Sequence, residues 1–366
     1  MPTVKLGDVV ERIKDKIDKD ATDLEFYIGG EHFDYGEVVI TKKAPLMGST
    51  IGPAFHMHFM PDDVLLMSRN PHLRKAGMVD FEGICSDVSY VCRTKDENVL
   101  LQKYLPFVFQ TDNFWEFAES NKKGSTNFFL NWSDFARYEF FLPDIEKQRE
   151  LTDLLWAAAD AKAAYQQLLE QTDELVKSQF IEMFGDPALN SKGLPIKNLL
   201  ELGENLDNRR VPITSGDRVV GQYPYYGASG IVDYIENYIF DEDILLISED
   251  GANLLARVTP IAFPASGKVW VNNHAHVMKF PNMATQCYVE HLLNMIDISN
   301  YVTGTAQPKL NQAKLNAIPI PTPSLDDQER YMQLIEQSDK SKFELKQAID
   351  STSGLIRALM QQDLSN

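Results

Sequence analysis

Cysteines and long apolar runs are scarce in this sequence, and each shortage excludes a class of protein. Only three cysteines occur among 366 residues, Cys85, Cys92 and Cys287, and no two of them form a C-x-x-C pair. The sequence therefore predicts neither a disulfide framework nor a zinc site. It has no run of about 20 apolar residues, so no membrane span is expected. Residues 1–19 lack the apolar core of a signal peptide, which predicts a cytoplasmic location.

Signatures of catalysis are also missing. The sequence has no Walker motif, no G-x-G loop after a strand, and no Asn/Asp-Pro-Pro-aromatic tetrapeptide of an adenine methyltransferase. Two H-x-H pairs, His56 with His58 and His274 with His276, would each face one side of a strand. No third ligand is placed beside either pair, so no metal site is predicted. We therefore expect a chain that is not an enzyme by itself and holds no cofactor.

Basic residues are the minority, since 35 Lys and Arg stand against 53 Asp and Glu and give a net charge of −18. This balance argues against nucleic acid at first sight. Half of the excess, however, lies in residues 144–186 and 324–366, which carry 4 basic against 10 acidic and 5 against 8 residues. The remaining bases cluster at Arg69, Arg74 and Lys75, at Lys122 and Lys123, and at Arg209 and Arg210. Each cluster alone is best read as a solvated loop, whereas converging clusters would form a positive face.

The most informative feature that is present is an internal repeat at an offset of 180 residues. Residues that recur are Gly124, Leu130, Asn131, Pro143 and Gln148, matched by Gly304, Leu310, Asn311, Pro323 and Gln328. A second set is Asp63, Leu65, Leu66 and Ser68, matched by Asp243, Leu245, Leu246 and Ser248. Solenoid repeats have periods of about 20–50 residues, so this spacing predicts a duplicated domain with pseudo-two-fold symmetry.

Each repeat has a globular and a helical part. Residues 1–143 and 187–323 are rich in Gly, Pro and aromatics and contain short alternating runs, which predicts domains of mixed α/β (α+β) type. Residues 144–186 and 324–366 have apolar residues at helical spacing. The chain is therefore predicted to run as domain, helix, domain, helix.

The helical parts are predicted to form two long helices over 145–183 and 325–362. Asp144 and Ser324 are candidate N-caps, and Gly185 marks the end of the first helix. Each helix carries an apolar stripe near heptad spacing, comprising Leu151, Leu155, Ala158, Tyr165, Leu168, Leu175 and Gln179, and Tyr331, Ile335, Ser338, Leu345, Ala348, Leu355 and Leu359. A stripe about 60 Å long needs a partner, so we expect an antiparallel coiled coil. The alternative is two helices that each pack on their own domain.

The junctions between the parts resemble those of the specificity subunit of type I restriction-modification enzymes. Residues 124–131 and 304–311 are similar to that family's exit from a recognition domain into a helix. Other segments typical of the family are 183–187, 223–230, 244–252 and 270–276. The resemblance implies two target-recognition domains, each reading one half of an asymmetric, bipartite site on double-stranded DNA.

The resemblance also implies partners. The helices would fix the distance between the half-sites and dock two methyltransferase subunits, and restriction/translocase subunits would complete the complex. S-adenosylmethionine would be bound by the methyltransferase, not by this chain. Two other hypotheses stay open. A single-chain DNA methyltransferase or nuclease is opposed by the missing cofactor loop, and an acidic coiled-coil scaffold or DNA mimic is favoured by the net charge but opposed by the duplicated loops.

Loop residues with side chains suited to phosphate or base edges are the candidate DNA contacts. They are Arg69, Arg74, Lys75, Lys122, Lys123, Ser125, Asn127, Arg209, Arg210, Tyr225, Tyr226, Ser229, Gln307 and Lys309. The two tyrosines could instead belong to a core strand beside a Gly-rich turn. Apolar helix residues left over from the helix pair are the candidate partner contacts, namely Trp156, Phe180 and Phe184.

Overall fold

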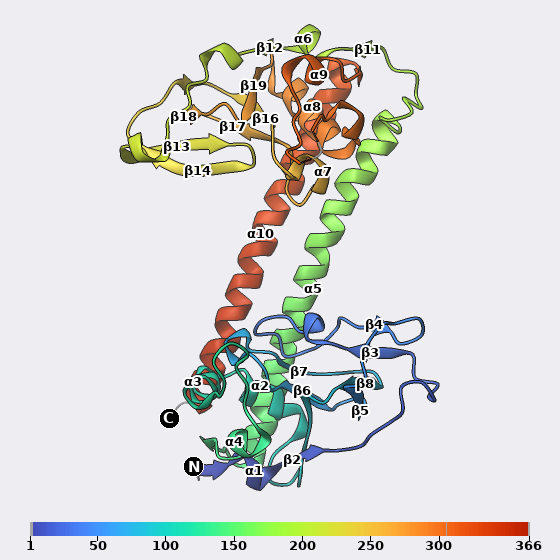
Figure 1. Ribbon diagram of the computed structural model, residues 1–366, viewed down its shortest axis with the longest axis vertical. Coiled ribbons are helices and arrows are strands. Elements are labelled where there is room, and N and C mark those ends of the chain that lie inside the picture. Colours follow the sequence, from blue (N-terminus) through green and yellow to red (C-terminus); the bar gives the residue numbers. More distant parts are fainter. Residues whose placement is uncertain (1–2, 305, 365–366) are drawn as a thin grey trace. The chain divides into compact units, whose positions relative to one another are not determined.

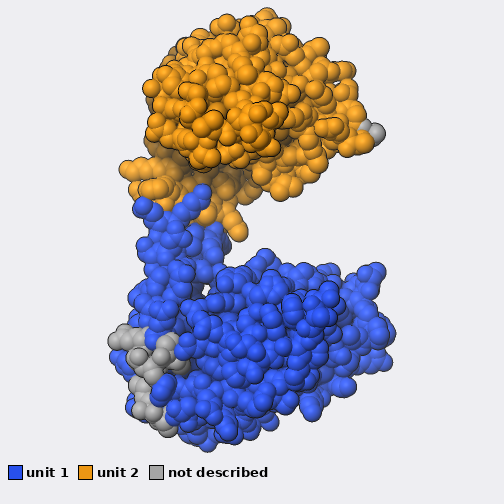
Figure 2. Space-filling view, turned by 60° about the vertical axis from the view of Figure 1, so that its left-hand side comes forward, with its two compact units in different colours: residues 1–167, 345–366 blue, residues 168–344 orange. Residues whose placement is uncertain are grey.

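The computed structural model describes residues 3–304 and 306–364 and separates into two compact units (Figures 1 and 2). Unit 1 contains residues 1–167 and 345–366, and unit 2 contains residues 168–344. Both units contain half of helix α5 (Ile145–Phe184) and half of helix α10 (Leu325–Leu364). The predicted domain boundaries lie at the ends of the two long helices, whereas the compact units divide near the middle of each helix. The predicted boundaries therefore stay a prediction. Met1 and Asn366, where the first and last predicted segments begin and end, lie outside the described residues.

Unit 1 is built on two four-stranded sheets with strand orders β2-β9-β6-β7 and β4-β3-β8-β5, and on the pair β1-β10. Its strands are β1 Thr3–Lys5, β2 Val10–Ile13, β3 Phe26–Ile28, β4 Ala44–Pro45, β5 Phe55–Phe59, β6 Val64–Met67, β7 Ala76–Met78, β8 Gly83–Ser86, β9 Ser89–Thr94 and β10 Glu139–Phe141. Its short helices are α1 Leu6–Val9, α2 Leu105–Phe109, α3 Asp112–Asn121 and α4 Trp132–Phe135.

Unit 2 has sheets of order β12-β19-β16-β17 and β14-β13-β18-β15, and the pair β11-β20. Its strands are β11 Ile196–Lys197, β12 Glu204–Asn205, β13 Val220–Gly227, β14 Gly230–Ile235, β15 Phe240–Asp241, β16 Ile244–Ser248, β17 Ala262–Ala265, β18 Lys268–Val271, β19 Ala275–Lys279 and β20 Ile320–Pro321. Its short helices are α6 Leu199–Leu202, α7 Asn253–Ala256, α8 Met283–Met295 and α9 Gln312–Asn316, and η4 (Asp207–Arg209) is a 3₁₀ turn.

The two units share one topology, which confirms the predicted duplication. Raising each strand number of unit 1 by ten gives the strand order of unit 2 in all three sheets. The offset is not 180 throughout, because β7 begins at Ala76 whereas β17 begins at Ala262. Helix α7 and its loops add this length. The mixed α/β class is confirmed for both units.

The recurring glutamines join the long helices to their sheets. Gln148 is fully buried, donates from Nε2 to the carbonyls of Val99 and Pro143 (2.8 Å each), and accepts from the Leu101 amide. Gln328 likewise donates to the Pro323 carbonyl and accepts from a neighbouring hydroxyl. Buried polar groups are costly unless they are hydrogen-bonded, which explains why this residue type recurs.

The predicted helices and their ends are confirmed. The Asp144 carboxylate accepts from the Lys147 amide (2.9 Å), and the Ser324 hydroxyl accepts from the amide of Asp327 (3.3 Å), so both predicted N-caps are present. Gly185 has φ +77°, the left-handed conformation that ends many helices.

The two long helices run antiparallel. In unit 1, the beginning of α5 packs on the end of α10 through Leu151, Leu155 and Met360. In unit 2, the end of α5 packs on the beginning of α10 through Val176 and Tyr331. The helices thus contact each other and the domain in both units, so neither of the two predicted arrangements excludes the other.

The predicted seam positions are wrong in part. Leu168, Leu175 and Leu355 are 47%, 53% and 48% exposed, whereas the adjacent Val176 is buried and Ile356 packs on the unit 1 core. A strict seven-residue repeat drifts by about 20° per heptad on a straight helix of 3.6 residues per turn. Positions predicted by a seven-residue repeat therefore shift from the buried face to the exposed face along a 40-residue helix.

Two of the three aromatic residues predicted to remain free for a partner, Phe180 and Phe184, are part of the unit 2 core, so the prediction is wrong for them and stays a prediction for Trp156. Phe180 and Phe184 are 0% and 2% exposed, and both pack on Tyr288 and Tyr331. Trp156 is half-buried against the unit 1 core and donates from Nε1 to the carbonyl of Lys103 (2.8 Å). Among the described residues, no helix is both long and apolar enough to cross a bilayer.

A carboxyl group beside the helix pair gives a prediction on stability. Burial, with the nearby charge of Asp339, raises the pKa of Glu290 from 4.5 to about 7. The folded state therefore holds this proton more tightly than the unfolded state, and stability decreases as pH rises from the unfolded toward the folded pKa. We expect Glu290→Gln to stabilise unit 2 by on the order of 2 kcal/mol near pH 8 and to change little near pH 5.

Chemical denaturation at both pH values measures this difference. Glu344→Gln, on the exposed face of α10, is the control and should change stability little at either pH. Equal stabilisation by Glu290→Gln at the two pH values would show that the effect does not arise from ionisation.

Candidate nucleic-acid interface

Each unit presents a hairpin loop where the sequence places its Gly-Ser/Thr motif. Lys123 and Phe129 exchange two backbone hydrogen bonds (2.8 and 3.0 Å), and Thr303 and Lys309 do the same (2.8 and 2.7 Å). Between these pairs, Gly124, Ser125, Thr126 and Asn127 are exposed in unit 1, and Gly304, Ala306 and Gln307 are exposed in unit 2. Thr305 lies outside the described residues, so the phosphate-binding role of the Gly-Thr turn stays a prediction.

Glycine is required at the start of both turns. Gly124 and Gly304 have φ +94° and +83°, in the left-handed region that L side chains rarely adopt. A Cβ atom would also lie 2.7 Å and 2.6 Å from the carbonyl oxygens of Asn127 and Gln307. The Leu-Asn pair that follows is structural too, because Leu130 and Leu310 are buried and Asn311 caps α9 by accepting from the amide of Lys314.

In unit 2, residues at the end of β16 bond the hairpin and two further loops. The Gly251 amide, after β16, donates to Pro308 of the hairpin (3.0 Å), and the Glu249 amide donates to His274 in the β18–β19 turn (2.9 Å). The Ser248 hydroxyl donates to the Ala228 carbonyl in the β13–β14 turn. In unit 1 the amides of Asn70 and Ser68 make the corresponding bonds to Phe128 and Val88 (2.9 and 2.8 Å).

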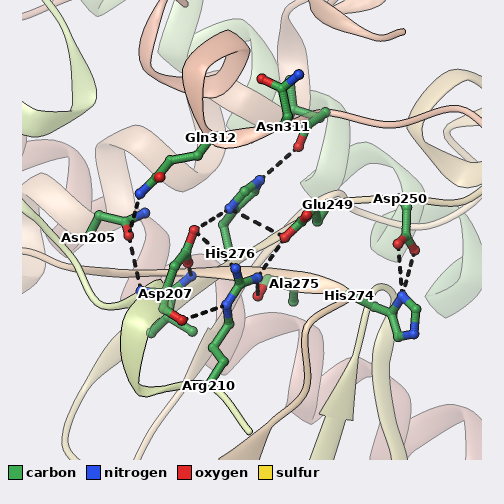
Figure 3. Close-up of polar contacts among 12 residues, drawn as sticks. Asn205, Asp207, Arg210, Glu249, Asp250, His274, Ala275, His276, Asn311 and Gln312 are labelled. Atoms are coloured by element: carbon green, nitrogen blue, oxygen red, sulfur yellow. Dashed lines mark hydrogen bonds and ion pairs between the residues drawn. The ribbon is translucent and has the colours of Figure 1, made fainter. Parts of the chain in front are cut away.

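A polar network underlies the loops of unit 2 (Figure 3). Arg210 donates to the Glu249 carboxylate (2.7 Å) and to the carbonyls of Asp207 and Ala275 (3.1 and 2.7 Å). His276 is only 1% exposed. Its Nδ1 bonds the Asp207 carboxylate (2.6 Å), and its Nε2 bonds the carbonyl of Leu310 (2.8 Å). The network joins η4, the end of β16, strand β19 and the hairpin.

The carboxylates of the network are held ionised. Burial opposes ionisation of Asp207, but the hydrogen bond and charge of His276 outweigh it, so the pKa of Asp207 is lowered. Burial also opposes ionisation of Glu249, and bonds from Arg210 and Lys309 outweigh it, so the pKa of that carboxyl is lowered as well. An ionised, hydrogen-bonded network of this kind fixes the geometry of the loops that it joins.

The comparisons with known proteins point to one family. Residues 192–352 match the family described as the type I restriction modification DNA specificity domain. A type I restriction enzyme specificity subunit of Haemophilus influenzae is 35% identical over 153 residues, which cover 42% of this chain and 39% of that protein. Residues 192–352 of this chain therefore carry a domain similar to the type I specificity domain.

Other relatives agree with this assignment. The EcoprrI type I restriction enzyme specificity subunit of Escherichia coli is 26% identical over 117 residues, covering 32% of this chain and 28% of that protein. The matched segments thus span less than half the length of these curated relatives. The crystal structure of the type I restriction-modification S subunit from M. genitalium has a TM-score of 0.64 at 13% identity, covering 98% of this chain and 95% of that one.

A structure from work on complex assembly of the type I restriction-modification system is also similar, with a TM-score of 0.57 at 15% identity over 99% and 97% of the two chains. These two structures share the fold of this chain. Their identities are too low to carry over individual residues.

In this chain, most of the predicted basic DNA contacts already have a partner inside the same unit. Those of unit 1 are Arg74 with Asp112, Lys75 with the Gly30 carbonyl, Lys122 with Glu119 and Lys123 with Asp134. Those of unit 2 are Arg209 with Glu242, Arg210 with Glu249 and Lys309 with Glu249. Arg69 is exposed and has no ion pair within the part of the chain that the structure describes.

The predicted DNA contacts divide into accessible and buried residues. Ser125, Asn127, Ser229, Gln307 and Lys309 are exposed in the converging loops, and their contact with DNA stays a prediction.

Two predicted DNA contacts are wrong because the side chains are enclosed. Tyr225 is 1% exposed and its hydroxyl bonds the backbone of Ile213, as the core-strand alternative requires. The Arg210 side chain is 13% exposed and saturated by the network. Tyr226 is half-buried and stacks on Phe263, so it reaches the surface only in part.

Sequence reasoning missed the carboxylates and histidines of the network. Its only signal was the H-x-H pair, whose members separate here: His274 lies in the turn before β19, 48% exposed and bonded to Asp250, while His276 is buried on the strand. In the other pair, His58 bridges Asp15 and Glu82 (2.7 Å each), and burial is outweighed by these bonds, so the pKa of His58 is raised. No group of ligands suited to a metal ion occurs among the described residues.

Proposed function

We propose that this chain is the DNA sequence-specificity subunit of a type I restriction-modification complex, and that its two units read the two halves of an asymmetric, bipartite site. The observation that carries the proposal is one loop cluster built twice on the same strand order with different exposed side chains. Ser125 and Asn127 occupy the turn in unit 1, and Gln307 and Lys309 follow the equivalent glycine in unit 2. Identical readers would recognise a palindrome, whereas different readers recognise two different half-sites.

Under this proposal the chain is not an enzyme and holds no cofactor. S-adenosylmethionine is bound by the methyltransferase subunits, two of which dock on the specificity subunit, and restriction/translocase subunits complete the complex. The family name and the fold support this assignment. The saturated network of unit 2 supports it further, since its groups are occupied in positioning loops.

Phe180 and Phe184 are buried and cannot contact a partner, so we propose a different surface for the methyltransferase subunits. Leu154, Leu168 and Leu175 are 47%, 47% and 53% exposed on α5, at intervals of fourteen and seven residues. This spacing places them along one stripe of the helix, which suits the apolar face of another helix. The methyltransferase subunits would cover this stripe.

Mapping methylated bases in the host genome with and without this gene tests the function. Loss of one bipartite methylation pattern on deletion, and its return on complementation, is the expected result. Purified complex should methylate a duplex with that site, and the isolated chain should bind no S-adenosylmethionine. An unchanged methylation pattern would contradict the proposal. Methylation by the isolated chain would favour the single-chain methyltransferase, and binding of the chain to a DNA-binding protein in place of DNA would favour the DNA mimic.

A further inference from the structure

The carbonyl that follows the hairpin is hydrogen-bonded by a different side chain in each unit. In unit 1 the hydroxyl of Tyr90 donates to the Leu130 carbonyl (3.1 Å). In unit 2 the imidazole Nε2 of His276 bonds the carbonyl of Leu310 (2.8 Å), which is the residue 180 positions later. Both carbonyls directly follow the DNA-facing hairpins. One molecule therefore contains two copies of a latch that differ in the chemistry of the donor.

The histidine latch faces acceptors on both sides. Asp207 Oδ2 lies 2.6 Å from Nδ1, and the Leu310 oxygen lies 2.8 Å from Nε2. Because a carboxylate and a carbonyl accept hydrogen bonds and cannot donate them, both bonds form only when the ring carries a proton on each nitrogen. The ring is 1% exposed, so water cannot replace a lost bond without opening the site.

Charged groups surround this ring from every packed element. Asp207 comes from η4, Glu249 follows β16 and lies 3.8 Å away, and Arg210 follows η4 and bonds both carboxylates. Lys309 of the hairpin bonds Glu249 (3.1 Å). Two carboxylates thus face His276 directly, and the two basic side chains bond those carboxylates.

We propose that His276 is a positioning residue whose doubly protonated ring locks the DNA-facing hairpin of unit 2, so that reading of the second half-site depends on pH and reading of the first does not. This inference rests on the proposed function for its consequence on DNA. The latch itself is a property of the loop and can be measured without DNA.

Deprotonation releases one end of the latch. A neutral ring that keeps its proton on Nδ1 retains Asp207 but turns a lone pair toward the Leu310 oxygen, and two acceptors repel each other. Release at Leu310 frees the end of the hairpin that carries Lys309. The tyrosine latch has no such step near neutral pH, because burial raises the pKa of Tyr90 above its ordinary value of 10.

Hydrogen–deuterium exchange of the full-length chain tests the latch directly. Rates are corrected for intrinsic exchange at each pH and compared between the segments 123–131 and 303–311. We expect protection of the Lys309 and Leu310 amides to fall by about tenfold or more from about pH 6 to about pH 9, and protection of the unit 1 hairpin to stay constant. A constant unit 2 hairpin, or equal loss in both hairpins, overturns the inference.

A test variant and a matched control variant distinguish loss of the latch from a general loss of protection in unit 2. His276→Gln should give a hairpin whose protection does not change with pH, because an amide does not titrate in this range. His274→Gln is the control, since His274 bonds Asp250 but not the hairpin carbonyl, and it should keep the wild-type pH dependence. A pH response that survives in His276→Gln, or disappears in His274→Gln, would show that another group carries it.

Methylation by the assembled complex links the latch to DNA. The probe is a duplex with the site mapped in the host genome, and two further duplexes each carry one altered half-site. Discrimination against the altered second half should weaken as pH rises, and discrimination against the altered first half should not. If exchange of the unit 2 hairpin depends on pH but the chain directs no methylation, the latch is supported and the proposed function is refuted. If the chain directs methylation but exchange of the hairpin does not depend on pH, the proposed function is supported and the latch is refuted.

Discussion

Under the proposed function, exchanging residues 187–323 for the equivalent domain of a type I specificity subunit is expected to change one half of the methylated DNA site completely and to leave the other half unaltered. The segment begins and ends at neighbouring points of the fold, because β11 pairs with β20 through Ile196 and Pro321. Both ends can therefore be replaced together without moving the end of α5 or the start of α10. Sequencing of methylated bases in cells that carry the exchanged chain measures the result.

The control is the reciprocal exchange of residues 1–143, whose ends also pair through Thr3 and Phe141. It should change only the other half-site. An incoming domain must present an apolar surface to Phe180 and Tyr331, which pack on this domain in unit 2, so a donor with residues of similar size at Leu199 and Tyr288 is the best choice. A change in both half-sites after either exchange would show that the two units do not read independently.

The duplication and the helix ends were predictable from the sequence because local physics fixes them. The recurring Gly must be glycine at Gly124 and Gly304, where a Cβ has no room and φ is positive. The recurring Gln is buried and fully bonded at Gln148. Residues with such demands keep their spacing when a domain is duplicated, whereas the loops between them, such as the one containing α7, can change length.

The errors at the helices and tyrosines arose from periodicities that were applied too loosely. Neighbouring residues on a strand point to opposite faces, so Tyr225 and Tyr226 could not both face one ligand. The structure buries the first and leaves the second partly exposed. Phe180 and Phe184 are four residues apart, follow Val176 by the same interval, and therefore share the buried face.

The ion pairs of the candidate site could not be predicted from the sequence. Arg210 and Glu249 are 39 positions apart, and His276 and Asp207 are 69 apart. Which acid meets which base depends on how β16, β19 and η4 pack, and sequence spacing does not contain that information. Basic clusters on an acidic chain were therefore read as free charges, although most of them are paired within their own unit.

Replacing Phe180 with aspartate is expected to unfold unit 2 and not merely to weaken assembly. The ring is fully buried and lies 5.0 to 5.5 Å from the rings of Phe184, Tyr288 and Tyr331. A carboxylate there removes these contacts and has no basic partner, and such changes destabilise a domain by about 4 kcal/mol or more. Thermal or urea denaturation of the full chain measures the loss.

Leu175→Asp on the same helix provides the matched test of the partner surface. Leu175 is 53% exposed and lies five residues before Phe180, on the outer face of α5. The substitution should change stability by no more than about 0.5 kcal/mol, because an exposed carboxylate stays hydrated. Under the proposed function it should still abolish co-purification of the methyltransferase subunits. Wild-type stability of Phe180→Asp would contradict the buried position of the ring, and normal assembly of a folded Leu175→Asp chain would remove the exposed leucines from the partner surface.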